Sequence, residues 1–242
     1  MRINKYISQC GVCSRREAER KILDAAVTVN GEIAHLGMDI AEGDKVMVDG
    51  KILKGIVSEK VVLAMNKPKG YLCTNEDPFD GGKTVFDILP APYNNMKLFC
   101  CGRLDKNSQG LTILTNDGDL ANKITHPSSG IIKRYRILLN RKFDPEVIPS
   151  LLRGVVNEGE TLRAHKIFFN PSSKIPDSDR RLEVWLQQGR KREIRRMFEA
   201  VGYFVKELKR FRIGAFELKR IPEGTCKRLG AAEIKKLLAA GD

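Results

Sequence analysis

Apolar and polar positions near the start of the chain follow the spacing of a small α/β unit. Apolar residues recur at helical spacing at Ile3, Tyr6, Ile7 and Cys10. Ser14 and Glu17 form a capping-box pattern, which predicts that a second helix begins there. The Asn30–Gly31 pair within "VTVNGEIA" is a strong hairpin-turn signal. We therefore expect residues 1–56 to form a helix-helix-hairpin domain.

The remaining residues, 57–242, show many strand patterns that do not alternate regularly with helices. The run "KRYRILLN" alternates, so one face of a strand should carry Lys133, Tyr135, Ile137 and Leu139. "RRLEVWLQQ" alternates in the same way, whereas "KREIRRMFEAVG" has the apolar stripe of a helix. "TVFDILP" predicts a short helix that ends at a proline. This pattern favours an α+β fold with a mixed, largely antiparallel sheet over a doubly wound parallel fold.

The charge balance narrows the class of partner. Lysine and arginine total 43 against 30 aspartates and glutamates, which gives a net charge of +13. Such an excess suits a polyanion, and nucleic acid fits better than a membrane because no strongly basic amphipathic anchor is evident. There is no run of about 18 apolar residues, and no apolar signal core at the start. We expect a cytoplasmic monomer with no membrane association.

Familiar signatures of metal or cofactor chemistry are missing from the sequence. Cys10 and Cys13 have C-x-x-C spacing, but no second pair follows, so reduced thiols are a better reading than zinc. We find no Walker-type loop, no G-x-G-x-x-G and no G-x-S-x-G, and the three histidines are scattered. An enzyme with this sequence would have to work without a metal, a cofactor or a histidine base.

Two basic segments are candidates for holding RNA. Between residues 189 and 212, nine basic side chains face three acids, with aromatic residues interleaved. The candidates from this segment are Lys191, Arg192 and Arg196. A helix start rich in arginine can also hold phosphate. The candidates from the N-terminal unit are Arg2, Lys5, Ser14, Arg15, Arg16 and Asn30. A solvated helix face remains the simpler explanation for Arg15 and Arg16 taken alone.

One carboxylate stands among cations in "CGRLDKNSQG". Asp105 lies between Arg103 and Lys106, directly before the apolar run at residues 111–114. An acid held beside a cation next to a buried strand can serve as a nucleophile or stabilise developing positive charge. An aspartate that caps its own turn is the structural alternative.

The order of four blocks, "GRLD", "GLTILTNDG", "KRY" and "GRKREIRRM", resembles the RsuA-type family of ribosomal pseudouridine synthases. The N-terminal unit resembles the small RNA-binding domain that this family shares with a bacterial small-subunit ribosomal protein. The resemblance implies isomerisation of uridine to pseudouridine in RNA, with no cofactor. It also implies that the target base leaves its stack before reaction.

The resemblance assigns roles to individual residues. Asp105 matches the essential aspartate, Tyr135 the tyrosine that packs on the base and assists at C5, and Arg195 the basic residue that pairs with the aspartate. The substrate pocket would include Arg103, Leu104 and Ile194. Arg192 and Arg196 remain alternatives for the pairing. The chain departs from the family at Ala25 and Ala26, where a glycine and a basic residue are usual.

Two other functions fit parts of the sequence. One is an RNA-binding ribosome-assembly factor that keeps the fold without the activity, and the other is a hydrolase of nucleosides or glycans. A hydrolase would need a second carboxylate, which the sequence does not offer clearly. The favoured substrate is ribosomal RNA, alone or in an assembly intermediate.

Overall fold

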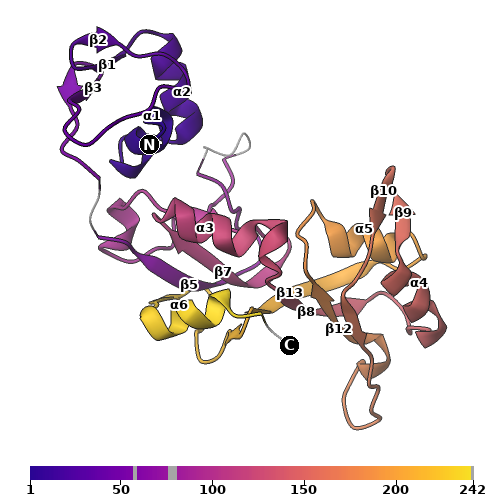
Figure 1. Cartoon of the computed structure of the whole chain (residues 1–242). Helices are drawn as coiled ribbons and strands as arrows, with labels where there is room; N and C mark the ends of the chain where they lie inside the picture. Colours follow the sequence, from indigo (N-terminus) through magenta and orange to yellow (C-terminus); the bar gives the residue numbers. More distant parts are fainter. Residues whose placement is uncertain (57–58, 76–80, 241–242) are drawn as a thin grey trace. The chain divides into compact units, whose positions relative to one another are not determined.

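The structure is a computed structural model, and it describes residues 1–56, 59–75 and 81–240. The chain divides into two compact units. Unit 1 comprises residues 1–60 and 116–118, and unit 2 comprises residues 61–115 and 119–242. Figure 1 shows both units coloured along the sequence.

Unit 1 pairs two helices with a four-stranded antiparallel sheet in the order β2-β1-β3-β4. Its elements are α1 (Ile3–Gln9), α2 (Arg15–Leu23), β1 (Val27–Val29), β2 (Glu32–Ile33), β3 (Val46–Val48) and β4 (Lys51–Ile52). Ser14 accepts a hydrogen bond of 3.2 Å from the backbone N–H of Glu17, so the predicted N-cap is confirmed. The predicted helical face is buried through Ile3 and Ile7.

The turns of unit 1 rest on residues in the left-handed conformation. Asn30 has φ of +53° in the β1–β2 turn, which confirms the predicted hairpin. Ala25, just after the end of helix α2, has a φ of +54°. The N–H groups of Ala25 and Ala26 then donate to Ile22 and Lys21. This is a Schellman-type ending in which alanine holds the position that glycine usually takes.

Unit 2 is built on a long mixed sheet, in the order β11-β12-β8-β13-β7-β5-β15, whose central strands succeed one another in Figure 1. Its strands are β5 (Val62–Lys67), β6 (Phe99–Cys101), β7 (Gln109–Thr115), β8 (Lys133–Leu139), β11 (Lys166–Phe168), β12 (Arg181–Leu186), β13 (Val205–Ile213), β14 (Phe216–Glu217) and β15 (Cys226–Arg228). Strands β9 (Val155–Asn157) and β10 (Glu160–Leu162) form a separate hairpin. The β13–β7 pair is parallel, and the other pairs are antiparallel. The predicted α+β class is thus confirmed.

Helices of unit 2 include α3 (Gly118–Thr125), α4 (Ile148–Arg153), α5 (Glu193–Glu199) and α6 (Ala231–Leu238). Short 3-10 turns occupy η1 (Tyr93–Asn95), η2 (Pro127–Ser129), η3 (Pro145–Val147) and η4 (Ser178–Arg180). The helix expected in "TVFDILP" is wrong, because residues 85–88 form turns. Asp87 accepts the Thr84 N–H at 2.6 Å, as at a helix start, but Pro90 follows soon after and restricts Leu89 away from the helical region.

The alternation predicted for strand β8 holds, and it decides what the core contains. Tyr135, Ile137 and Leu139 join a large apolar cluster with helices α4 and α5. A second cluster packs residues of β5 and β7 against α3 and α6. The parallel β13–β7 pair joins these two halves at Lys209–Gln109 and Arg210–Gly110. No described helix is long and apolar enough to cross a membrane.

Candidate active site

Asp105 lies in the loop between β6 and β7, directly before the parallel junction. Its side chain is 36% exposed, so the carboxylate can be reached from outside. The carbonyl oxygen of Asp105 accepts the Ser108 N–H at 3.0 Å, which closes a turn. Asp105 therefore lies in a turn, as predicted. Its backbone carbonyl closes that turn, which leaves the side-chain carboxylate available to a ligand.

Arg195, on helix α5, brings its guanidinium to this loop. Its Nε lies 3.9 Å from Asp105 Oδ2, and its Nη2 lies 3.4 Å from the Ser108 hydroxyl. Nη1 donates to the Val205 carbonyl at 2.6 Å, so the group is held from a third element, β13. Burial lowers the pKa of Arg195, and the Asp105 charge opposes that shift. Of the three arginines considered from the sequence, Arg195 is the one that meets Asp105.

Arg196 points elsewhere, and its predicted contact with RNA is corrected here. It is 8% exposed. Its Nη1 donates to Glu160 at 2.6 Å, and its Nη2 donates to the Asn157 carbonyl at 2.9 Å. The guanidinium thus ties the β9–β10 hairpin to α5. Neighbouring Lys191 and Arg192 are exposed, as a contact with RNA would require.

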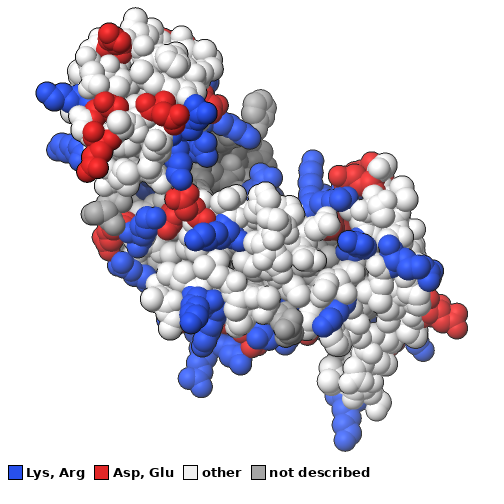
Figure 2. Space-filling model, in the orientation of Figure 1, with Lys and Arg blue, Asp and Glu red and all other residues white. Residues whose placement is uncertain are grey.

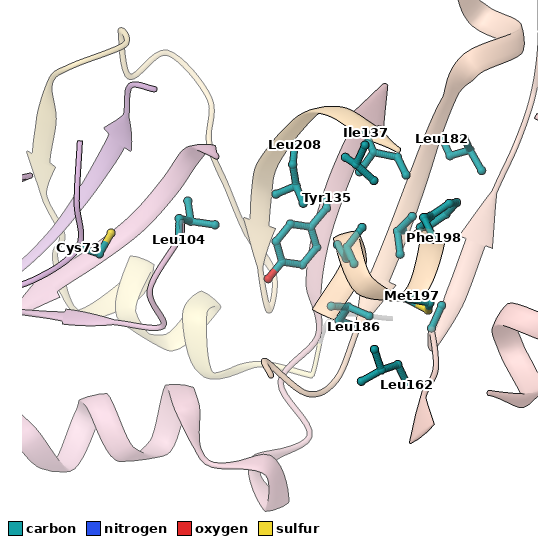
Figure 3. Packing of buried hydrophobic residues seen from close by; sticks show 14 of the residues in the cluster. Cys73, Leu104, Tyr135, Ile137, Leu162, Leu182, Leu186, Met197, Phe198 and Leu208 are labelled. Atoms are coloured by element: carbon teal, nitrogen blue, oxygen red, sulfur yellow. The ribbon is translucent and has the colours of Figure 1, made fainter. Parts of the chain in front are cut away.

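Tyr135 comes from β8, where it lies opposite Arg210 of β13 and Val184 of β12. Its side chain is buried at 6% exposure. Figure 3 shows its ring between Leu104 on one side and Ile137, Leu182 and Phe198 on the other, with the hydroxyl pointing away from Phe198 and Leu182. A ring in this position can pack on a ligand while its hydroxyl reaches a polar group.

The residues predicted for the substrate pocket divide by burial. Leu104 and Ile194 are buried, at 7% and 3% exposure, and both belong to the cluster that contains Tyr135. Arg103 is exposed beside them. Leu104 and Ile194 therefore form the apolar part of the predicted pocket, whereas Arg103 remains open to solvent.

Lys67 is a buried cation that the sequence analysis missed. Its side chain is fully buried at the end of β5. Its Nζ donates to the carbonyl oxygens of Ser108 at 2.7 Å, of Pro68 at 3.0 Å, and of Asp105 and Lys106 at 3.2 Å. Burial lowers its pKa. These hydrogen bonds hold the loop that carries Asp105 against the end of β5.

Arg210 is a second missed cation, on β13 at 1% exposure. Its Nη2 donates to the Gly102 carbonyl at 2.6 Å and its Nε to the Leu111 carbonyl at 2.7 Å, so it spans the loop from end to end. Gly110, at φ +105°, lets this strand approach, because a Cβ there would lie 2.2 Å from the Arg210 carbonyl oxygen. Lys67 follows an apolar run, whereas Arg210 is one of several cations in "VKELKRFRI", so the sequence did not distinguish it from its neighbours.

A thiol also meets this loop. The Cys100 thiol and the Leu104 N–H donate to Cys73, and together they lower its pKa despite its burial. The Leu104 N–H directly precedes Asp105. The position of the carboxylate is thus set by contacts from β5, β6, β13 and α5.

The N-terminal candidates differ in what they can still bind. Ser14, Arg15 and Arg16 are exposed at the start of α2, where a phosphate could approach. Asn30 is committed to the fold, since its amide donates to Asp44 and its oxygen accepts the Lys45 N–H, both at 2.9 Å. Asn30 is nevertheless exposed, and its contact with RNA stays a prediction.

Arg2 and Lys5 complete the N-terminal set. Arg2 is exposed, donates to the Gly37 carbonyl and lies 3.5 Å from Asp39. Lys5 is half-buried on α1. Arg2 is therefore tethered by an exposed ion pair, which a phosphate could replace at little cost.

The surface cavities and the side chains that could bind a metal do not indicate a different site. One surface cavity of about 220 Å³ is bordered by Arg163 and His165, and another of about 560 Å³ by Phe86 and Tyr93. Neither is lined by Asp105 or Arg195. Within the described ranges, no three histidine, cysteine or acidic side chains cluster in a way that could hold a metal.

Comparisons with known proteins agree with the geometry. The sequence pattern described as "RNA pseudouridylate synthase" matches residues 61–200, and that of the S4 domain matches residues 1–46. A solved structure described as a pseudouridylate synthase has a TM-score of 0.70 and 29% identity, and the match covers 98% of this chain and 99% of that one.

Curated relatives are similar over almost the whole chain. A ribosomal large subunit pseudouridine synthase B of Xylella fastidiosa is 37% identical over 98% of this chain, and the match covers 50% of that protein. The chain thus spans half the length of that relative. An RNA pseudouridine synthase of Aquifex aeolicus is 36% identical, with coverage of 99% and 94%. The dual-specificity RNA pseudouridine synthase RluF of Escherichia coli K12 is 38% identical, with coverage of 97% and 77%.

Proposed function

This chain belongs to the RNA pseudouridylate synthase family, and we propose that it isomerises a uridine of ribosomal RNA to pseudouridine without a cofactor. The observation that carries this proposal is the pairing of Asp105 with Arg195, 3.9 Å apart, on a loop held by two buried cations. The isomerisation adds no atoms to the nucleotide and removes none, so one carboxylate can suffice where a glycosidase needs two.

Asp105 is the residue we place at the sugar. Its carboxylate attacks C1′ or stabilises positive charge there while the bond from C1′ to N1 of uracil breaks. The uracil, kept in the site, turns and forms a bond from C5 to C1′, and where the carboxylate had bonded to C1′ that bond breaks and Asp105 is released as the free carboxylate. The proton on C5 then leaves, and N1 gains one. Arg195 supplies a fixed counter-charge that orients the carboxylate throughout.

Tyr135 and its neighbours receive the base in this proposal. The ring packs against uracil, while Leu104 and Ile194 exclude water from its surroundings. The Tyr135 hydroxyl points away from Phe198 and Leu182 (Figure 3), and in this proposal it assists proton transfer at C5. The target nucleotide must first leave its stack, at a cost of a few kcal/mol that is smaller in a loop.

Positive charge compensates that cost. The net charge is +13, and Figure 2 shows basic side chains scattered over the visible face of the molecule. Residues 1–56, with Arg15 and Arg16 exposed at a helix start, would grip structured RNA, and residues 57–242 would carry the catalysis. The partner is ribosomal RNA or an assembly intermediate in the cytoplasm, bound by a monomer.

The test uses ribosomal RNA tritiated at C5 of its uridines, since loss of the C5 proton releases tritium to water. The wild-type protein should release tritium, and Asp105→Asn should release none while binding the RNA with unchanged affinity. Asp179→Asn, a change in the 3-10 turn η4, is the matched control and should behave like the wild type. No release from native or protein-free RNA would reject the proposal.

The same assay separates the two competing functions. An RNA-binding assembly factor would bind RNA and release no tritium, with or without Asp105. A hydrolase would liberate free uracil, which chromatography of the reaction detects.

A further inference from the structure

The sheet of unit 2 has a second face that the proposed active site does not use. On β8 the side chain of Tyr135 faces the apolar cluster, so Arg134 and Arg136 face the other way. Trp185 lies directly opposite Arg134, and Glu183 opposite Arg136. We name this surface the reverse face. It comprises Arg134, Arg136, Lys166, Phe168, Arg181, Glu183, Trp185, Lys209, Phe211 and Arg212.

Cations cover the aromatic rings of the reverse face. The Arg134 guanidinium lies 3.5 Å from the centre of the Trp185 ring, and Lys166 Nζ lies 5.0 Å from it. The Arg136 guanidinium lies 4.4 Å from the centre of the Phe211 ring. Both rings are buried, at 6% and 8% exposure, yet neither belongs to the apolar clusters found among the described residues. Their cover is therefore charged.

The charge of this surface is strongly positive. Six of its side chains are basic, namely Arg134, Arg136, Lys166, Arg181, Lys209 and Arg212. Glu183 is an acid among them and accepts the Trp185 indole N–H at 2.6 Å, and Glu207, two residues before Lys209 on the same face, lies 3.7 Å from Lys69 Nζ. Arg136, Lys166 and Arg181 are exposed, and no ion pair is found for them within the described part of the chain. Three cations are thus open to an anionic partner.

We propose that the reverse face binds the sugar-phosphate backbone of the same RNA, outside the segment that enters the active site. This inference rests on the proposed function, which supplies the RNA. A guanidinium stacked by its flat side on a ring keeps its N–H edge directed outward, which is the geometry that a phosphate accepts. The Trp185 and Phe211 rings are covered, and Phe168, at 49% exposure, is the exposed ring of the named set, so most of what this face offers a partner is charge.

A ribosomal RNA is large enough to engage both faces. The loop with Asp105 holds a single nucleotide, whereas affinity for RNA comes mainly from many phosphate contacts. The reverse face would add contacts that do not depend on the bases. Binding there should therefore change affinity and its response to salt, and leave the chemical step untouched.

The experiment compares two triple variants of the full chain. The first is Arg136→Gln, Lys166→Gln and Arg181→Gln on the reverse face. The control is Lys142→Gln, Lys235→Gln and Lys236→Gln, which removes the same charge from exposed positions elsewhere. Affinity for protein-free ribosomal RNA is measured by filter binding over a range of salt. Circular dichroism checks that both variants fold.

We expect the reverse-face variant to bind about tenfold more weakly near 0.15 M salt, and its slope of log K against log salt to fall by about two. The control should change far less. The single-turnover rate at saturating protein should equal that of the wild type. Equal losses in both variants, or none in the first, would overturn the proposal.

Two further outcomes are separate from these. If the reverse-face variant binds protein-free RNA normally and loses affinity only for a ribosomal particle, the partner is a protein, and the proposal for RNA is overturned. If the wild type releases no tritium, the proposed function fails, while the binding comparison still reports on the reverse face. Failure of one inference is thus distinguishable from failure of the other.

Discussion

Replacing Arg210 by methionine tests whether the buried cations position the catalytic loop. The change removes two hydrogen bonds, to the Gly102 and Leu111 carbonyls at 2.6 and 2.7 Å. Leaving two buried acceptors unsatisfied costs about 2–6 kcal/mol in total. Removing a buried guanidinium saves several kcal/mol of desolvation, which is of the same size. The free energy of unfolding should therefore change little.

The effect on the reaction should be much larger than the effect on stability. Arg210 spans both ends of the segment that carries Asp105, so its loss lets the carboxylate shift. A displacement of about 1 Å costs roughly a hundredfold in rate. We expect Arg210→Met to lower the single-turnover rate by about that factor, equal to about 2.7 kcal/mol in the barrier. RNA affinity should stay within about twofold, because the side chain is buried.

The assay is tritium release at saturating protein, so that weaker binding cannot mimic a slower step. Lys206→Met, an exposed change on the same strand, is the control and should keep the wild-type rate. Arg210→Lys should recover part of the rate, since it restores one donor. A wild-type rate in the folded Arg210→Met protein would refute the positioning argument.

Two further predictions concern stability. Lys133 is 5% exposed, and burial, followed by the charge of Arg210, lowers its pKa from 10.5 to about 8. The unfolded chain therefore binds more protons between these values, so this group destabilises the fold fully below pH 8 and not at all above 10.5. Lys133→Met should raise the free energy of unfolding by up to about 3 kcal/mol at pH 7, and by less at pH 10. Denaturant titrations measure both gains. An equal gain at pH 7 and pH 10 would contradict this prediction. Ala25→Gly should stabilise the chain by about 0.5–1 kcal/mol in thermal melts because Ala25 is left-handed at φ +54°, whereas Ala26→Gly should not.

The prediction of local structure from sequence was right where short patterns carried the information. The period of two in β8 placed Tyr135 with Ile137 on the buried face. The capping pattern at Ser14 and the turn at Asn30 were local too, and the structure has both. The expected helix at residues 85–88 failed because Pro90 restricts Leu89 and the turns do not continue, although Asp87 caps the Thr84 N–H as at a helix start.

The roles of charged residues could not be predicted so well, because charge on a helix or strand does not say what lies opposite. Arg196 was taken for an RNA contact, and it ties a hairpin through Glu160 instead. Lys67 and Arg210 were overlooked, although each holds the Asp105 loop. The roles assigned to Asp105 and Arg195 came from the family resemblance, which no periodicity would have supplied.

By itself, the sequence determined several of the strands and helices, the charge excess and the membership of a family, since these depend on neighbouring residues or on ordered motifs. Only the tertiary structure decided which of three nearby arginines meets Asp105, and which cations lie under the loop. The reason is that Lys67, Arg195 and Arg210 arrive from β5, α5 and β13, which are far apart along the chain. Their convergence depends on the parallel register of β13 against β7, which the backbone forms only when the whole sheet is assembled.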